Sequence, residues 1–135
     1  MFFKKEIKNN NFYTRICALL IHAARIDENY SNKEEEIIIR TLEELGLEKN
    51  KIPSIIDDAK KIEENSNQIL DFTKEVKNMS EKDKIKIVET LWSIIYSNKD
   101  ADIYETSLMR RLAGLLYIDT KTMGDIKEKV KKENS

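Results

Sequence analysis

The chain has 135 residues, 36% of them charged, and its 24 lysine and arginine residues nearly balance its 25 aspartate and glutamate residues. A net charge of -1 gives no reason to expect attraction to nucleic acid or to an anionic membrane surface. The single cysteine excludes an internal disulfide and a cysteine-rich zinc site, and no apolar run is long enough to span a membrane, so we expect one cytoplasmic domain over residues 1–135.

Glycine (three) and proline (one) are scarce, which favours long helices joined by short turns, and no strand pattern is found. The first helix is expected over residues 11–26, where apolar residues cover most of the circumference, so it should lie deep in the core with Cys17. A second helix should begin at Ser31, because Ser31 and Glu34 have the spacing of a capping box, and should end at Gly46.

The third helix is expected from residue 52, with Pro53 in its first turn and a polar break at 63–67 as its end. A fourth helix should carry the apolar residues between Ile69 and Met79, and a fifth should begin at Ser80.

Asp102 and Glu105 predict the start of a sixth helix, which should end at Tyr117 without a glycine. Asp119 or Thr120 should cap a charged seventh helix that packs on the rim and frays beyond Lys131. The pattern therefore predicts an all-α fold, a compact bundle of about seven helices.

The chain also contains an internal repeat. The sequence of residues 20–34 returns, degraded but in register, at residues 91–105, and the match extends to copies of about 16–47 and 87–118. Each copy is an apolar helix, an acidic turn and a second helix. Two copies predict a pseudo-two-fold domain rather than a solenoid.

The acidic turns are the candidate site. Carboxylate oxygens are the ligands that Ca²⁺ or Mg²⁺ prefers, so a metal site would use Asp27, Glu28, Glu34, Asp102 and Glu105. A surface for a basic protein partner would use the same residues together with Asp100. A true EF-hand is excluded because Asn32 and Ile38 stand where its glycine and last glutamate would be. Helix capping alone is the simpler explanation for Ser31 with Glu34 and for Asp102 with Glu105.

Three other groups of residues are candidates for catalysis or ligand binding. His22 is the only histidine, and a structural role is favoured over metal ligation or proton transfer because a lone histidine makes a poor zinc site. The carboxylate pairs at 57–58 and 63–64 are interpreted as solvated faces. Arg110 and Arg111 would either clamp an anion or pair with an acidic turn, since Arg111 matches Arg40 in the repeat.

Residues 24–35, Ala-Arg-Ile-Asp-Glu-Asn-Tyr-Ser-Asn-Lys-Glu-Glu, resemble the Ala-Asp-Gly-x-Val-Ser-x-x-Glu signature of the TerB-like tellurite-resistance family. Residues 98–105 and 108–113 look like the second signature of that family, and the likeness extends from about Ile16 to Met123. The resemblance implies about seven helices with an internal two-fold relation, in bacterial proteins linked to tellurite and other chemical stress. It also implies no enzymatic activity, and acidic turns that bind metal or dock a partner.

This chain departs from the family pattern in both turns. Glu28 and Lys99 replace the usual glycine, and Asn98 replaces the first aspartate of the second copy. Because Asn98 and Lys99 lower the negative charge of the second turn, the departures disfavour a metal there more than they disfavour docking.

The leading hypothesis is therefore a non-enzymatic module that binds a divalent cation or a basic protein partner. One alternative is a metal-dependent hydrolase that uses the same carboxylates with His22 as acid or base. Another is a structural homo-oligomer, which would expose an apolar patch around Phe2 and Phe3 or on the last helix.

Overall fold

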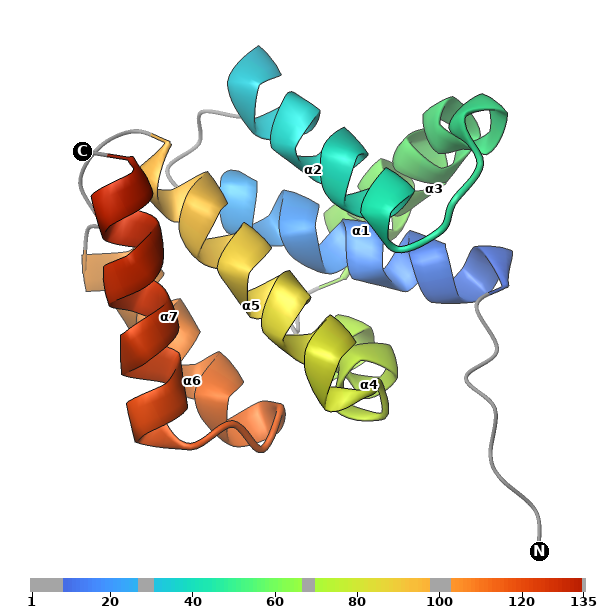
Figure 1. Cartoon of the computed structure of the whole chain (residues 1–135). Coiled ribbons are helices and arrows are strands. Elements are labelled where there is room, and N and C mark those ends of the chain that lie inside the picture. The colour runs from blue at the N-terminus through green and yellow to red at the C-terminus, as the bar shows by residue number, and fades with distance from the viewer. Residues whose placement is uncertain (1–8, 27–30, 67–69, 98–102, 135) are drawn as a thin grey trace, which may run out of the picture.

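The computed structural model describes residues 9–26, 31–66, 70–97 and 103–134, and within these ranges it contains seven α-helices, one 3₁₀ helix and no strand. This confirms the all-α class and the number of helices. In chain order (Figure 1), the elements are α1 (Asn10–Ala24), α2 (Asn32–Glu44), η1 (Lys49–Lys51), α3 (Ile52–Glu64), α4 (Leu70–Lys77), α5 (Glu81–Tyr96), α6 (Ile103–Leu115) and α7 (Thr120–Glu133). The short 3₁₀ helix was not foreseen.

Helix α1 is the centre of the bundle. It packs against α2, α3, α4 and α5, and it runs through the middle of the molecule in Figure 1. Its residues from Ile16 to Ile21 are all buried, as expected for a helix that is apolar around most of its circumference. Burial raises the pKa of the Cys17 thiol to about 12, so this cysteine is a core residue rather than a nucleophile.

Helix α2 begins and ends where its sequence signals predict. Ser31 Oγ accepts from the backbone N–H of Glu34 at 3.2 Å, and Glu34 Oε1 accepts from the Ser31 N–H at 2.8 Å, which completes a capping box. At the other end, Gly46 has φ 106°, its N–H donates to Glu43 O, and the Leu47 N–H donates to Leu42 O. These two bonds form a Schellman motif.

Helix α6 ends with the same backbone arrangement, although it has no glycine there. Tyr117 has φ 56°, its N–H donates to Gly114 O, and the Ile118 N–H donates to Ala113 O. Both helix bounds of α6 fall 71 positions after those of α2. The local structures thus agree at corresponding positions, whereas the pseudo-two-fold relation between the copies stays a prediction.

Helix α7 is buried more deeply than its charged sequence suggested. Met123, Ile126 and Val130 are buried, and the helix packs against α5. Asp119 caps it by accepting from the Thr122 N–H at 2.7 Å, and the helix continues to Glu133. The expectation that it frays beyond Lys131 is therefore wrong, and so is the expectation of an exposed apolar patch on this helix. Its place at the edge of the bundle in Figure 1 agrees with the expected packing on the rim. Apolar side chains at intervals of three and four residues bury one face despite the charges on the other.

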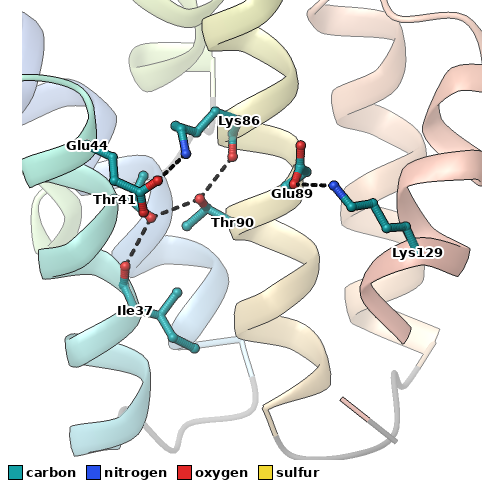
Figure 2. Close-up of polar contacts among 7 residues, drawn as sticks. All are labelled: Ile37, Thr41, Glu44, Lys86, Glu89, Thr90 and Lys129. Carbon is teal, nitrogen blue, oxygen red and sulfur yellow. Dashed lines mark hydrogen bonds and ion pairs between the residues drawn. The ribbon is translucent and has the colours of Figure 1, made fainter. Parts of the chain in front are cut away.

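The contact between α2 and α5 is polar (Figure 2). Thr41 Oγ1 lies 2.9 Å from Thr90 Oγ1, and these hydroxyls donate to Ile37 O at 3.0 Å and Lys86 O at 2.9 Å. Each threonine has one hydroxyl hydrogen, and a carbonyl oxygen can only accept. When both hydroxyls donate to the carbonyls, no hydrogen is left for a bond between Thr41 and Thr90. Lys86 pairs with Glu44 on one side of this contact.

Candidate functional site

Glu34, the candidate ligand in α2, is part of the capping box. Its side chain is 1% exposed, and its Oε1 also accepts from the Ser31 hydroxyl at 2.9 Å. The capping explanation for Ser31 and Glu34 is therefore confirmed. Because a helix N-terminus favours a carboxylate, the α2 dipole compensates part of the charge that Glu34 buries.

Glu105, the corresponding residue of the second copy, lies in the first turn of α6 and is 5% exposed. Two carboxylates at matching positions are thus removed from solvent, each in the first turn of its helix. The other candidate site residues, Asp27, Glu28, Asp100 and Asp102, lie outside the described residues. The same is true of Asn98, Lys99, Phe2 and Phe3.

Described residues that flank the two acidic segments line one hollow. Ile26 immediately precedes the first segment and Tyr104 closely follows the second, and both line a surface hollow of about 370 Å³. We call this the junction hollow; the described residues that line it are Ile26, Tyr104, Ser107, Leu108 and Arg111. The sequence placed both turns at helix junctions, but it could not show that the junctions adjoin each other.

The junction hollow combines apolar, aromatic and charged groups. Tyr104 is 73% exposed, whereas Leu108 is buried beneath the surface. Arg111 is exposed, and it forms no ion pair with another described residue. The interpretation of Arg111 as the partner of an acidic turn stays a prediction, because those turns lie outside the described ranges.

His22 lies beside a carboxylate of α3. Its Nδ1 lies 3.3 Å from Glu63 Oε2 of α3, and Arg25 Nη1 donates to Glu63 Oε1 at 2.7 Å. The Glu63 side chain is only 13% exposed, so its interpretation as part of a solvated face is wrong. Glu64 and the pair Asp57 and Asp58 are exposed, as expected.

Glu63 was missed because its partners are 38 and 41 residues away along the chain. They meet only through the packing of α1 on α3, which no local pattern reveals. The cluster accounts for His22 as a structural residue, since one carboxylate holds both His22 and Arg25. Among the described residues, no three histidine, cysteine, aspartate or glutamate side chains are gathered in a way that could hold a metal ion.

Comparison with known families gives a match over most of the chain. The model of the family described as tellurite resistance protein TerB matches residues 14–128. The chain belongs to the TerB family. The resemblance found in the two acidic signatures is thereby confirmed, and so is the all-helical fold that it implied.

The match begins within α1 and ends within α7, so it includes α2 to α6 completely. No curated protein and no solved structure matches the chain. None of the TerB helices in the described ranges has the length and apolar character needed to cross a membrane.

Proposed function

We propose that this TerB domain is a non-enzymatic binding module that docks a basic segment of a partner protein at the junction hollow. The observation that carries the proposal is the convergence of Ile26 and Tyr104 on that one hollow. These residues adjoin the two acidic segments along the chain, which supports a single charged surface. Asp27, Glu28, Asp100 and Asp102 would supply the charge of that surface.

The character of the hollow supports a protein partner. Tyrosine is enriched at interfaces because it offers a large, rigid contact area with a polar tip, and Tyr104 is one of the two large hydrophobic side chains exposed among the described residues. A partner that inserts an apolar side chain over Leu108 and directs lysine or arginine toward the acidic segments would satisfy both parts of the surface. Arg111 would then donate to a carbonyl or carboxylate oxygen of the same segment.

The test uses twelve-residue peptides with a central leucine flanked by lysine and arginine, and a matched set in which glutamate replaces the basic residues. We expect the basic peptides alone to bind, more weakly as salt increases, since surface charges are screened. Tyr104→Ala should weaken binding about tenfold, the effect of truncating an interface hot spot. Tyr117→Ala is the matched control, because Tyr117 is equally exposed but does not line the hollow.

Two results would contradict this proposal. In the first, peptides of both charge types bind equally well. In the second, Tyr104→Ala and Tyr117→Ala change the affinity by the same factor, which would place the peptide elsewhere on the surface.

A divalent cation is the second candidate ligand, because the two acidic segments contain the carboxylate groups that hard cations prefer. Ca²⁺ and Mg²⁺ require several oxygen ligands, which Asp27, Glu28 and Asp102 would complete. Calorimetric titration of Ca²⁺, Mg²⁺ and Mn²⁺ should then release or absorb heat and raise the unfolding temperature. Glu34→Gln should reduce that response, whereas Glu36→Gln, on the exposed side of α2, should not. No heat and no thermal shift would remove the metal proposal and leave docking untouched.

The family description adds a physiological proposal, which is that the module acts in the response to tellurite. Deletion of its gene should then increase sensitivity to tellurite. Wild-type protein should restore growth, and the Tyr104→Ala variant should not. If both proteins restored growth, the role in the response to tellurite would not depend on the junction hollow.

A further inference from the structure

A second hollow lies among α5, α6 and α7, and the function proposed above does not use it. It has a volume of about 230 Å³, and its apolar part is formed by Trp92, Met109, Ala113 and Met123. We call it the α6–α7 hollow. Pockets for whole small ligands hold roughly 300–1,000 Å³, so this one has the size for a single large side chain.

The two hollows use opposite faces of α6. The junction hollow takes Tyr104, Ser107, Leu108 and Arg111, whereas the α6–α7 hollow takes Thr106, Met109, Arg110 and Ala113. Both sets have spacings of three and four residues, and they are offset by two positions. Two positions correspond to about 200° around a helix, so a ligand in one hollow does not occupy the other.

The floor of the α6–α7 hollow is polarizable and adaptable. The Trp92 indole N–H donates to Met123 Sδ at 3.4 Å, and a thioether is a weak acceptor. Methionine side chains are unbranched and adjust to irregular apolar partners, which is why they recur at binding surfaces. Two of the four methionines of the chain, Met109 and Met123, lie here.

A glycine inside α7 leaves the hollow open. Gly124 lies in the fifth position of a 14-residue helix, where glycine is the poorest helix former apart from proline. A Cβ atom at Gly124 would meet no atom within 4 Å, so neither close packing nor a left-handed backbone requires the glycine. Any larger side chain there would project toward free space at the edge of the hollow, which this residue lines.

The rim of the hollow carries two cations. Arg110 is exposed and forms no ion pair with another described residue. Lys127 Nζ lies 5.5 Å from the centre of the Trp92 ring, over its face. None of the described residues that line the hollow is acidic. An apolar floor beneath two positive charges is therefore complementary to an apolar group that has a carboxylate beside it.

We propose that the α6–α7 hollow receives a large apolar side chain from a partner protein segment in which an aspartate or glutamate lies within two residues of that side chain. The apolar group packs on Trp92 and the methionines, and the carboxylate pairs with Arg110 or Lys127. This segment has the opposite charge to the one proposed for the junction hollow, so the module has two faces of different chemistry.

The test selects twelve-residue peptides from a random displayed library on the full chain, and synthesises enriched peptides that lack tryptophan. Enrichment should favour phenylalanine, leucine or methionine next to aspartate or glutamate. Because Trp92 is the only tryptophan, these peptides should change its fluorescence emission on binding. Arg110→Glu combined with Lys127→Glu should weaken their binding at least tenfold.

Gly124→Leu is the decisive variant, because it fills the edge of the hollow while improving helix propensity, so it should fold at least as stably as the wild type. This variant should bind the selected peptides at least tenfold more weakly than the wild type does. Gly114→Leu is its matched control, since Gly114 is also inside a helix with free space around its Cβ position but does not line the hollow. That control should change the affinity less than twofold.

Three outcomes would overturn the proposal: no enrichment, enrichment without the acidic and apolar combination, or equal binding to Gly124→Leu and Gly114→Leu. A change of Trp92 fluorescence on addition of laurate, without a change on addition of the selected peptides, would also overturn the proposal. The hollow would then bind an anionic amphiphile instead of a protein segment.

Discussion

Helices α2 and α6 end in the same backbone conformation, but one end has glycine and the other has tyrosine. Gly46 and Tyr117 both have positive φ, and each is followed by the pair of hydrogen bonds of a Schellman motif. Gly46 faces a close neighbour, because a Cβ atom there would lie 3.3 Å from the Tyr13 hydroxyl. Tyr117 is 71% exposed, with Lys77 Nζ 4.7 Å from its ring centre.

This left-handed conformation is therefore imposed by the helix end and its hydrogen bonds, not by the residue type. Where the site is open, a tyrosine tolerates a left-handed backbone at a cost of about 1–2 kcal/mol, and the contact with Lys77 offsets about 0.5–1 kcal/mol of that cost. Where the site is packed, as at Gly46, the chain has glycine. Substitutions that exchange these features test the interpretation.

The largest effect is expected from Gly46→Ala. It should lower the free energy of unfolding by about 1–2 kcal/mol, because φ 106° is strained for any residue with a Cβ atom. The new methyl group also presses on the Tyr13 hydroxyl, which donates to Leu45 O at 3.1 Å. Urea unfolding measures the change.

Gly114→Ala is the control for that measurement, because Gly114 is helical and has space around its Cβ position. It should raise the free energy of unfolding by up to about 1 kcal/mol. If the two alanine variants lost equal stability, the effect at Gly46 would reflect glycine replacement in general and not the left-handed cap.

A smaller effect of opposite sign is expected from Tyr117→Gly. Relief of the backbone strain should exceed the loss of the Lys77 contact, so the free energy of unfolding should rise by about 0.5 kcal/mol. In a Lys77→Ala background the gain should increase toward about 1 kcal/mol, because nothing then offsets the strain. A loss of stability in that background would show that Tyr117 is not strained.

The smallest effect concerns the contact between α2 and α5. Thr41 and Thr90 form a hydroxyl pair, whereas the corresponding positions of the other copy, Leu112 and Leu19, are leucines in the core. Replacing both partners of a buried hydrogen bond by apolar groups of the same shape is nearly neutral, so Thr41→Val with Thr90→Val should change stability by less than about 0.5 kcal/mol.

A double-mutant cycle checks that value. The two hydroxyl hydrogens are shared among three contacts, so the Thr41–Thr90 contact is not a full hydrogen bond. The coupling free energy between Thr41 and Thr90 should therefore stay below about 1 kcal/mol. A coupling of 2 kcal/mol or more would mean that the hydroxyl pair holds the two helices together.

Local signals in the sequence were sufficient to predict most helix ends. Ser31, Gly46, Ser80 and Asp119 act through hydrogen bonds to residues at most four positions away, so their effect can be read from spacing alone. The fourth helix was expected to reach Met79, but α4 ends at Lys77. Ile69, its expected first apolar residue, lies outside the described residues.

The contacts between helices could not be predicted in the same way. The pairing of Glu63 with His22 and Arg25 depends on how α1 and α3 cross, and the burial of α7 depends on the shape of α5 beneath it. For the candidate site, the sequence identified the acidic junctions, but the convergence of Ile26 and Tyr104 is a property of tertiary packing. No local pattern in the sequence predicted the α6–α7 hollow.

The most direct test of the central claim is nuclear magnetic resonance mapping of the ¹⁵N-labelled chain during titration with the basic peptides. Amide shift changes should concentrate at Ile26, Tyr104, Ser107 and Arg111, and the amide signals of Gly124 and Lys127 should stay unchanged. Shift changes that concentrate away from the junction hollow, with Ile26 and Tyr104 unaffected, would contradict the claim that the two acidic segments form one binding surface.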